Sequence, residues 1–468
     1  MRQSILQGRL GAGVKLPSTR RLSNDLGVSR NTVLIAFEQL VAEGYLVTKL
    51  GSGTFVAEGL PESFLKAPRV KPGSSNTDTS PRTVSGRGSR LTELEAAFLS
   101  DQELPRAFQT GLTSINDFPF DIWKRILSRS LRGSGPTNLD YLGYREIQGH
   151  PPLREAISRY LAISRGLVCE PDQIFIVNGS QQGLDLAARV LLDKGEAAYI
   201  EDPCYRGVVG ALRAAEALTV PIPLDEEGFS IAEADKRNEK VTAVFVTPSH
   251  HFPTGTVMTL GRRLELLEWA EERGAWIVED DYDSEFRFDG KPLSALSGLD
   301  RYDRVIYAGT FSKVMFPSMR LGYLVVPADL VSVFRKALLF TSLHAPTLEQ
   351  AALTEFINEG HFVRHIRRMK KLYAEKQNIL AVEIQEHLSD FLDVKPDNAG
   401  MSLIAWLKGT ESDTELAERA LSRGVYVAPL SFFCLESSLP DALIFGYAGI
   451  EESEIRESVR LLRGAFSY

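Results

Sequence analysis

The sequence predicts an α/β protein in which a large, mostly parallel sheet follows a small unit at the N-terminus. Short apolar runs alternate with helical stretches between residues 174 and 309, as in parallel strands that are buried on both faces and joined by helices. A segment rich in Ser, Thr, Gly and Pro, from Pro72 to Arg90, separates this body from a basic head. The length of 468 residues also indicates more than one compact unit.

The composition is typical of a soluble globular protein, with 44% hydrophobic and 24% charged residues. The sequence shows no run of eighteen apolar residues and no secretory signal, so we expect neither a membrane span nor export. The cysteines Cys169, Cys204 and Cys434 lack metal-type spacing, so we expect neither a disulfide scaffold nor a metal site. Together these features predict a cytoplasmic protein.

Charge is distributed unevenly along the chain. The net charge is −8, but residues 1–56 hold seven Lys and Arg against three Asp and Glu, and residues 57–90 hold six against three. The first ninety residues therefore carry about +7 and the remainder about −15. A basic head on an acidic body indicates that the head alone meets a polyanion. Chance clustering of solvated charges is the alternative if no DNA-binding fold accompanies it.

These observations divide the chain into a head over 1–57, a flexible linker over 58–106 and a body over 107–468. The linker has almost no large apolar residues, so burial could not offset the entropy of ordering it. Ligands bind at the carboxyl ends of strands in α/β sheets, so the residues just after each apolar run are the candidates for function. The expected strands of the body are 174–178, 197–201, 241–247, 275–279 and 304–309.

The head contains the stretch LPSTRRLSNDLGVSRNTV, which predicts two helices joined at Gly27, with Ser18 and Ser29 as their N-caps. Two helices joined in this way form a helix-turn-helix, in which the first residues of the second helix reach base edges. The residues at that place are Arg30, Asn31 and Thr32. The apolar positions of the second helix are Val33, Phe37, Leu40 and Val41.

The segment YLVTKLGSGTFV predicts two short strands around Gly51 and Gly53, a wing in which Lys49 can approach a phosphate. With its EGYL and GSGTF signatures, the head resembles the GntR family of winged-helix repressors over about forty residues. This resemblance implies DNA contacts from Arg20, Arg30, Asn31, Thr32, Gly51 and Gly53. A winged helix that binds protein rather than DNA is the alternative.

The first helix of the head is expected to be short. In domains of this kind it usually begins ten or so residues earlier, whereas only MRQSILQG precedes the turn here, so either the helix is short or the chain starts late. A short first helix is expected to leave Val33 and Phe37 poorly covered and to weaken DNA binding.

The body carries, after its apolar strands, residues that suit a phosphorylated aldehyde cofactor. In YAGTFSKVMFPSMRLGY, Lys313 lies in a turn of small residues, where burial would lower its pKa and make it a Schiff-base lysine. Ser180 and Gln181 open a helix after IFIVN and can present backbone N–H groups to a phosphate. Further candidates for phosphate binding are Thr310, Ser312 and Arg320.

The pyridine ring of such a cofactor acts as an electron sink when a carboxylate lies against its nitrogen. Glu279, Asp280 and Asp281 all stand at the end of the strand AWIVE, so the residues alone leave three candidates. Tyr282 can reach the phenolic oxygen of the cofactor, and Tyr205, in EDPCYRG, can stack on its ring.

The ordered motifs NGSQQ, EDPCY, EDDYDSEF and GTFSKVMFPSMRLGY resemble those of fold type I aminotransferases over residues 107–468. The resemblance implies a large sheet domain with a small α+β domain, pyridoxal 5′-phosphate as cofactor, the Schiff base on Lys313, and Asp280 against the pyridine nitrogen. It implies further cofactor contacts from Ser180, Gln181, Tyr205, Tyr282, Thr310 and Arg320. Tyr144, in DYLGYREIQG, matches a tyrosine that these enzymes lend to the neighbouring subunit, which implies a homodimer.

The chain departs from ordinary aminotransferases at two places. Phe252 replaces the asparagine of an Asn-Pro-Thr-Gly motif; His250 or His251 could take over its contact with O3′, or be satisfied within the loop. Ile444, in LIFGYA, stands where these enzymes place the arginine that holds the substrate carboxylate. The candidate effector contacts are then Arg206 and His251.

Head, linker and body together resemble the MocR family of regulators over nearly the whole chain. This resemblance implies a DNA-binding transcriptional regulator whose effector, pyridoxal phosphate or an amino acid or amine, is sensed through the aldimine on Lys313. The departure at Ile444 favours a regulator over an enzyme, with residual or half-transamination left open. A functional aminotransferase with a vestigial head is the alternative, and a cofactor-binding interaction module without DNA contacts is a third hypothesis.

Overall fold

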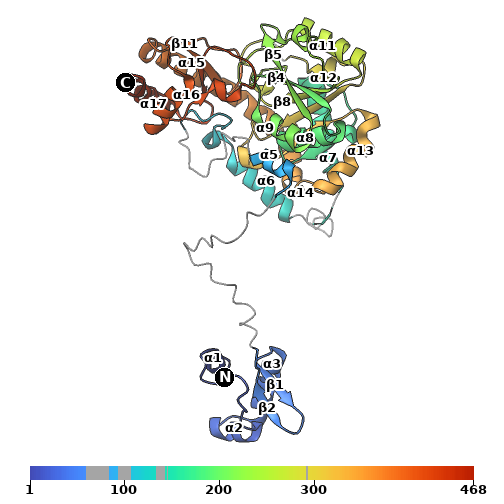
Figure 1. Ribbon diagram of the computed structural model, residues 1–468, viewed down its shortest axis with the longest axis vertical. Coiled ribbons are helices and arrows are strands. Elements are labelled where there is room, and N and C mark those ends of the chain that lie inside the picture. The colour runs from blue at the N-terminus through green and yellow to red at the C-terminus, as the bar shows by residue number, and fades with distance from the viewer. Residues whose placement is uncertain (60–83, 93–106, 133–142, 145, 291–292, 468) are drawn as a thin grey trace. The chain divides into compact units, whose positions relative to one another are not determined.

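The computed structural model describes residues 1–59, 84–92, 107–132, 143–144, 146–290 and 293–467. The chain divides into two compact units, Met1–Thr83 and Val84–Tyr468, which we describe separately (Figure 1). The boundary falls within the predicted linker, most of which lies outside the described residues. Among the described residues, no helix is long and apolar enough to cross a membrane.

The first unit is a winged helix-turn-helix, as predicted. Ser18 accepts a hydrogen bond from the backbone N–H of Arg21 at 3.3 Å and caps the first helix of the motif, and Ser29 caps the second through Thr32 at 3.1 Å. Gly27 ends the first helix at φ 67°, a left-handed conformation that glycine adopts without strain. The elements are α1 (Arg2–Leu6), α2 (Thr19–Leu26), α3 (Arg30–Ala42), and the antiparallel strands β1 (Leu46–Lys49) and β2 (Gly53–Val56).

The short helix α1 does cover the core of the head, contrary to our expectation. Its Ile5 is 2% exposed and shares one apolar cluster with Val33 and Phe37, which are 4% and 5% exposed. One turn of helix is therefore sufficient to close this small core. Val41 was predicted to face the same core but is 38% exposed, because it follows the buried Leu40 by one helical step of about 100°.

The second unit is built around an eight-stranded mixed sheet in the order β3-β10-β9-β8-β7-β4-β5-β6. Neighbouring strands from β9 to β5 run parallel, whereas β10 is antiparallel to both β3 and β9. The mostly parallel sheet predicted from the apolar runs is thus confirmed. Its strands are β3 (Ile174–Val177), β4 (Ala197–Asp202), β5 (Leu218–Asp225), β6 (Gly228–Phe229), β7 (Val241–Val246), β8 (Trp276–Asp281), β9 (Val305–Thr310) and β10 (Gly322–Val325).

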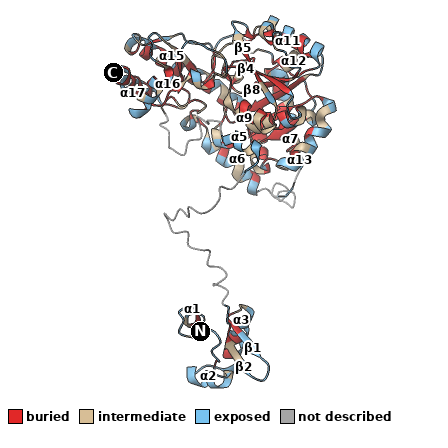
Figure 2. Cartoon of the chain, viewed as in Figure 1, coloured by how far each residue is buried: buried red, intermediate tan, exposed pale blue. Residues whose placement is uncertain are grey.

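Helices cover both faces of this sheet, and central strands such as β4 and β9 are buried at every residue (Figure 2). Ile200 of β4 packs with α8 (Ser180–Leu191) and α9 (Arg206–Ala214), while its neighbour Tyr199 packs with α11 (Leu260–Arg273) on the opposite face. Other helices of this part are α6 (Phe120–Arg132), α7 (Pro151–Ser164), α10 (Ile231–Ala234), α12 (Leu296–Leu299), α13 (Val331–Thr341) and α14 (Thr347–Asn358).

A smaller antiparallel sheet with its own helices completes the second unit, which confirms the predicted small α+β domain. One apolar cluster runs from the large sheet into this domain, so the two share a continuous core. The strands, in the order β11-β12-β14-β13, are β11 (Leu392–Val394), β12 (Ser402–Leu407), β13 (Ala428–Pro429) and β14 (Ala442–Gly446), and the helices are α15 (His361–His387), α16 (Asp413–Ser422) and α17 (Glu452–Phe466).

Helix α5 (Gly86–Thr92) lies inside the segment predicted to be a flexible linker. It belongs to the second unit and packs on α9 (Figure 1). Arg90 forms an ion pair with Glu216 at 2.5 Å, and its carbonyl accepts a hydrogen bond from Arg213 at 3.5 Å. The structure differs from the linker prediction over these residues, because composition does not report a tertiary contact that orders a polar helix.

Candidate functional site

The predicted site residues of the body lie at the side of the large sheet where its parallel strands have their carboxyl ends. Gly322, the first residue of β10, pairs with Val177 at the end of β3 and with Thr310 at the end of β9, which sets these two ends close together. On the other side of β9, Asp280 of β8 pairs with Ala308. The strand ends that carry the motifs therefore converge, as expected for a ligand site in an α/β sheet.

Lys313 lies in the turn after β9, with its side chain directed at the segment that precedes α6. Its Nζ donates a hydrogen bond to the carbonyl of Gly111 at 3.0 Å. Gly111 has a φ of 78°, which favours glycine, and a Cβ there would lie 2.5 Å from this Nζ, so a larger residue would displace the amine. Burial lowers the pKa of Lys313, although Asp283 and Asp280 oppose this effect. A neutral amine is the form that attacks an aldehyde.

Several polar atoms near this sheet edge are buried without a hydrogen-bond partner among the described residues. Each unpaired buried polar atom costs about 1–3 kcal/mol, so such a group indicates a polar ligand that satisfies it. Hydroxyl, amide and carboxylate groups at the same strand ends as the partly buried Lys313 fit the phosphate and pyridine of pyridoxal phosphate. The atoms are Thr110 Oγ1, Gln181 Oε1, Arg206 Nε, Asp280 Oδ1 and Ser312 Oγ.

The sequence left three carboxylates as candidates for the pyridine nitrogen. Of these, Asp280 has a buried oxygen without a hydrogen-bond partner among the described residues. Glu279 accepts two backbone N–H groups at the start of α12, at 2.9 and 2.8 Å. Asp281 forms a buried ion pair with Arg165 at 2.8 Å. Burial, and after it the charge of Asp281, raises the pKa of Asp280 to about 7, while Lys313 lowers it. A pyridinium N–H would stabilise the ionised form of this carboxyl.

The start of α8 and the side chain of Arg320 lie together. Ser180 is the first residue of α8, and Gly179 before it has a φ of 83°. Arg320 donates a hydrogen bond to the carbonyl of Asn178 at 2.9 Å, just before this helix. Its own φ is 46°, a strained conformation for a residue other than glycine. Backbone N–H groups and a guanidinium at one place suit a phosphate dianion.

Tyr205 and Tyr282 approach from the ends of β4 and β8, and both rings lie edge-on to Phe252, at 6.4 and 6.1 Å between centroids. The phenylalanine that replaces the expected asparagine therefore forms an apolar wall between the two tyrosines. Gln181 donates a hydrogen bond to the carbonyl of Gly207 at 2.9 Å, which ties α8 to the start of α9.

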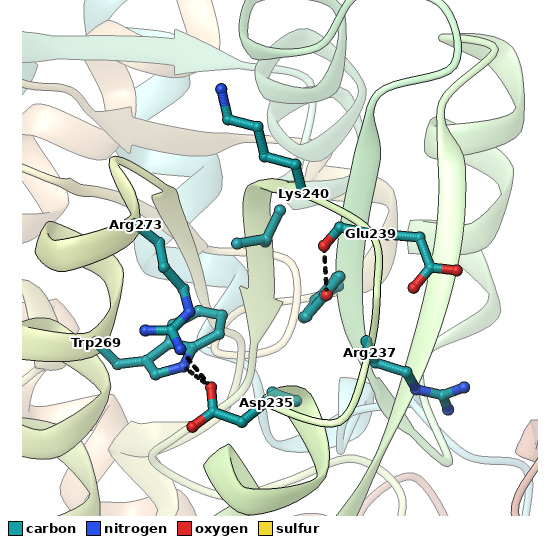
Figure 3. A pocket seen from close by; sticks show the side chains of 9 residues that line it. Asp235, Arg237, Glu239, Lys240, Trp269 and Arg273 are labelled. Atoms are coloured by element: carbon teal, nitrogen blue, oxygen red, sulfur yellow. Dashed lines mark hydrogen bonds and ion pairs between the residues drawn. The ribbon is translucent and has the colours of Figure 1, made fainter.

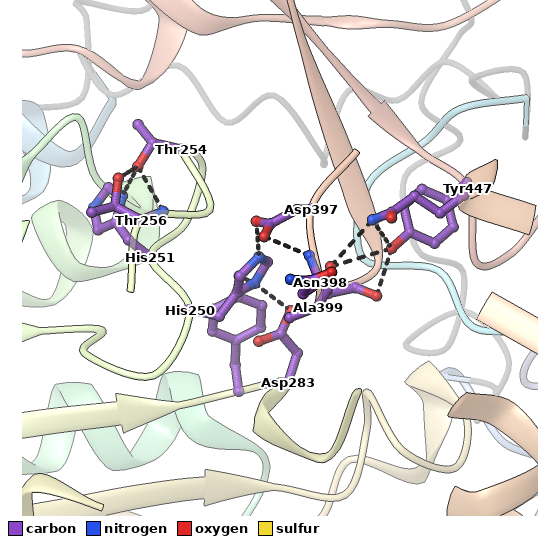
Figure 4. Close-up of polar contacts among 12 residues, drawn as sticks. His250, His251, Thr254, Thr256, Asp283, Asp397, Asn398, Ala399 and Tyr447 are labelled. Carbon is purple, nitrogen blue, oxygen red and sulfur yellow. Dashed lines mark hydrogen bonds and ion pairs between the residues drawn. The ribbon is translucent and has the colours of Figure 1, made fainter. Parts of the chain in front are cut away.

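The two adjacent histidines of TPSHHFPTG have different environments (Figure 4). His250 Nδ1 lies 3.2 Å from the hydroxyl of Tyr282. His251 Nδ1 instead lies 2.8 Å from the hydroxyl of Thr254 in its own loop, and burial lowers its pKa to about 3. Of the alternatives left open by the sequence, His250 is thus the one beside Tyr282, and His251 is bonded within the loop.

Ile444, at the position of the expected carboxylate clamp, is fully buried in an apolar cluster that includes Phe433 and packs against Phe252. The rings of these two phenylalanines are 5.0 Å apart. Arg206 lies near this wall, with its guanidinium 5.4 Å from the ring centroid of Phe432. Among the described residues, the apolar cluster around Ile444 contains no cation, and Arg206 is a candidate for binding an anionic group beside it.

Tyr144 does not join the site within its own chain. Its side chain is 89% exposed, and its ring contacts His344 edge-on at 6.4 Å between centroids. Exposure of a large aromatic side chain is what a residue that serves a neighbouring subunit requires.

A separate pocket opens near the start of β7, toward the amino ends of the parallel strands, whereas Asp280 lies near the carboxyl end of β8 (Figure 3). Its polar groups bond mainly to one another: Asp235 accepts hydrogen bonds from Trp269 at 2.7 Å and from Arg273 at 2.6 Å. None of the predicted site residues lines this pocket.

The predicted DNA-contact residues all lie on the exposed surface of the head: Arg20, Arg30, Asn31, Thr32, Lys49, Gly51 and Gly53. Within the described residues, neither Arg20 nor Arg30 forms an ion pair, so both guanidinium groups are available to phosphates or base edges. Lys49 lies over the ring of Phe55 at 5.3 Å, which holds its ammonium at the wing.

Comparisons with known proteins match the two parts of the chain. Residues 1–56 match the gntR family of bacterial regulatory proteins, and residues 112–462 match the aminotransferases of class I and II. The chain is 42% identical to the probable rhizopine catabolism regulatory protein MocR of Rhizobium meliloti, over 100% of this chain and 92% of that protein. It is 30% identical to the HTH-type pyridoxine biosynthesis transcriptional regulator PdxR of Corynebacterium glutamicum, over 97% and 92%.

Among solved structures, the body is similar to LysN, the α-aminoadipate aminotransferase of Thermus thermophilus complexed with N-(5′-phosphopyridoxyl)-L-leucine. The TM-score is 0.70 and the sequence identity 29%, over 78% of this chain and 92% of that one.

Proposed function

Because the chain belongs to the MocR family of transcriptional regulators, which join a GntR-type head to a pyridoxal phosphate-binding aminotransferase-like body, we propose that this body is the sensor of the regulator. The signal is pyridoxal phosphate itself, or an amino compound that reaches the cofactor at Lys313. The observation that carries the proposal is a partly buried lysine at a sheet end that also holds unpaired buried polar atoms, in a site where Ile444 stands at the position of the substrate clamp.

Different residues of the site are proposed to contact different parts of the cofactor. Bound pyridoxal phosphate supplies an aldehyde that amines can attack. Lys313 would bind the aldehyde carbon, Asp280 would keep the pyridine nitrogen protonated, and Tyr205 would stack on the ring. Tyr282 would contact O3′. Ser180, Gln181, Thr310, Ser312 and Arg320 would hold the phosphate.

The apolar wall around Ile444 favours a sensor over an efficient aminotransferase. Without a cation there, the carboxylate of an ordinary amino acid would be buried unpaired, which is unfavourable. Arg206 is then the group that binds an anionic end of the effector, if it has one. The rival function is transamination with a vestigial head, and it is supported by the intact set of Lys313, Asp280 and Tyr282.

We propose that the regulator is a homodimer in which Tyr144 reaches the neighbouring subunit's cofactor phosphate. The exposed ring of Tyr144 and the similarity to aminotransferases support this arrangement. A dimer would also bring two heads to one operator, which matches the two-fold symmetry of most helix-turn-helix binding sites.

Helix α9 offers a route from the sensor to the linker. Tyr205 and Arg206 stand at its start, and Arg90 of α5 is bound just beyond its end through Glu216. The nine residues of α9 form one rigid element about 14 Å long, so a shift at its start is carried to α5. The chain from α5 leads back through the linker to the head. A ligand that favours one position of α9 over another would change the head's DNA affinity.

The test measures DNA affinity of the full chain by fluorescence anisotropy, on the intergenic DNA beside its gene, with pyridoxal phosphate and a panel of amines. We expect the affinity to change severalfold with one of these compounds. Rapid single turnovers of amino donors with a keto-acid acceptor, together with no ligand effect on DNA affinity, would contradict the sensor and favour the enzyme.

The proposed route has its own matched pair of variants. Arg90→Glu reverses the charge that binds α5 to Glu216, whereas Lys194→Glu reverses a second charge on the same carboxylate, 3.2 Å away, without touching α5. We expect Arg90→Glu to reduce the ligand effect on DNA affinity and to leave cofactor binding unchanged. Equal ligand effects in the two variants would contradict a route through α5.

A further inference from the structure

His250 is buried between two carboxylates that belong to different parts of the body (Figure 4). Its Nδ1 lies 3.0 Å from Asp283 Oδ2, just beyond the end of β8 in the large domain. Its Nε2 lies 3.3 Å from Asp397 Oδ2, in the segment that joins β11 and β12 of the small domain. One imidazole therefore connects the large and the small domain at the cofactor site.

Two carboxylates facing the two ring nitrogens favour the doubly protonated imidazole. A neutral imidazole has one N–H and one lone pair, so one nitrogen would face a carboxylate without a proton. With both nitrogens protonated, Nδ1–H donates to Asp283 and also faces the hydroxyl oxygen of Tyr282 at 3.2 Å. The Tyr282 hydroxyl is itself hydrogen-bonded to the Asp283 carboxylate, so His250 and Asp283 together hold this hydroxyl in place.

Two glycines make room for this contact. A Cβ on Gly400 would lie 2.3 Å from His250 Cε1, and a Cβ on Gly255 would lie 2.5 Å from Asp397 Oδ2. Both residues have positive φ, of 91° and 76°. The backbone therefore approaches the ring and the carboxylate from both domains more closely than any other residue type would permit.

The segment 397–400 is bonded on both sides. The amide of Gly400 donates to the carbonyl of Phe286 at 3.0 Å, and Phe288 donates to the carbonyl of Asn398 at 2.7 Å. The carbonyl of Gly400 accepts from the hydroxyl of Tyr447 at 2.8 Å. A displacement of Asp397 would thus be passed to β12 and to the residue that follows β14.

Other charged groups around the imidazole do not cancel its charge. Burial lowers the pKa of His250, but Asp283 and then Asp397 outweigh it and raise the value to about 10. His251 lies close in sequence but is neutral, since burial holds its pKa at about 3. Burial raises the pKa of Asp397, while His250, and more weakly Arg287, lower it further than burial raises it. Tyr282 remains protonated, because burial raises its pKa well above 10.

We propose that His250 is a positioning residue that, together with Asp283, holds the Tyr282 hydroxyl in place at the cofactor site and, through Asp397, fixes the segment 397–400 of the small domain. The contact takes the place of the asparagine that Phe252 replaces. It rests on the proposed cofactor site, and it adds a link by which a change at O3′ reaches the small domain.

The test compares the full-length wild type with His250→Gln, Asp397→Asn and the control Asp393→Asn, an exposed carboxylate on β11 near Asp397. Pyridoxal phosphate is the probe, and its bound absorbance is titrated from pH 5 to pH 10. An imidazolium favours the less protonated cofactor, so we expect His250→Gln to raise the apparent pKa of the absorbance change by about one unit. Asp397→Asn should shift it less, and Asp393→Asn not at all.

A second measurement needs no cofactor. Hydrogen exchange of the cofactor-free chain is expected to quicken at the amides of 398–400 in both His250→Gln and Asp397→Asn, and to stay unchanged in Asp393→Asn. Unchanged exchange in Asp397→Asn would overturn the link between the domains, even if His250→Gln fails to fold. An absorbance pKa equal to that of the wild type in His250→Gln would overturn the orientation of Tyr282.

Failure of the underlying function gives a different result. If the wild type itself does not retain pyridoxal phosphate, the proposed sensor site is wrong and the role toward Tyr282 falls with it. If the wild type binds the cofactor normally, and His250→Gln and Asp397→Asn show the same absorbance pKa and hydrogen exchange as the Asp393→Asn control, the cofactor site stands and the role of His250 is refuted.

Discussion

The head and the body arrange their functional residues in opposite ways. In the head, Arg30 and Asn31 stand at the exposed start of one helix, a few residues from the glycine that turns the chain. In the body, Asp280 is buried and Lys313 partly buried, and the pairing of β8 with β9 brings the chain segments that carry them to neighbouring strand ends. The first arrangement is local in sequence, and the second is created by the sheet.

This difference follows from the ligands. DNA is a large polyanion that must dock from outside, so its contacts remain solvated until counterions are released. A small cofactor is enclosed, so its contacts lose water in advance and stay unpaired until it binds. We therefore expect substitutions in the head to change DNA affinity with little effect on the body. Substitutions in the cofactor site should change cofactor affinity and the pH dependence of the body's stability.

The largest expected effect comes from Lys313→Ala. Without the amine that holds the aldehyde, we expect pyridoxal phosphate to be lost during gel filtration, while low-salt DNA binding by the head remains. The measurement is absorbance of the purified chain together with anisotropy on DNA, and Lys124→Ala on the exposed face of α6 is the control. A cofactor band that survives the substitution would contradict the assignment of Lys313.

Asp280→Asn tests the buried charge of the body. We expect pyridoxal phosphate to bind about 2 kcal/mol more weakly, because an ionic hydrogen bond to the pyridine nitrogen is lost. In the wild type the affinity should rise between pH 6 and pH 8, as Asp280 ionises near its pKa of about 7. Asp280→Asn should remove this part of the rise, and the remainder reports the deprotonation of Lys313.

The stability of the cofactor-free chain should fall with rising pH, whereas the cofactor affinity should rise. The folded-state pKa of Asp280 is raised above its ordinary value of 3.8, so ionisation disfavours the fold. Its contribution to stability is therefore lost as the pH rises from about 4 to about 7, and Asp280→Asn should remove that loss. Identical pH profiles of thermal unfolding for the two chains would refute the buried, unpaired state of this carboxyl.

Arg30→Ala tests the exposed charge of the head. We expect DNA binding to weaken by about 1–3 kcal/mol, with a smaller salt dependence if the guanidinium meets a phosphate. Arg21→Ala is the control, since Arg21 lies on α2 and pairs with Asp25 at 3.9 Å. Cofactor absorbance should be the same in both variants. Equal DNA affinity in Arg30→Ala and the wild type would favour a protein-binding winged helix.

The same difference explains what could be predicted from the sequence. The helix-turn-helix was readable because Ser18, Gly27 and Ser29 each act on the few residues beside them. The strand ends were readable because Lys313 and Asp280 directly follow apolar runs, so strand order was not needed to select them.

The remaining features depend on contacts between distant segments. Gly111 meets Lys313 across 202 positions of the chain, and Asp397 meets His250 across 147. An isolated glycine or aspartate in a loop carries no periodic signal, so neither could be selected in advance. Helix α5 was missed for the same reason, because Arg90 is held by Glu216, 126 residues away. The choice among Glu279, Asp280 and Asp281 likewise required their partners.

The smallest expected effect, that of Ser18→Ala, sharpens the comparison most directly because it is purely local. Loss of the cap bond to the N–H of Arg21 should reduce the stability of the head by about 1 kcal/mol. Hydrogen exchange should quicken in α2, while the amides around Lys313 and the cofactor absorbance stay unchanged. Ser52→Ala, on the exposed wing, is the control. Since the head closes its own core around Phe37, any change in exchange within the body would show that the two units do not fold independently.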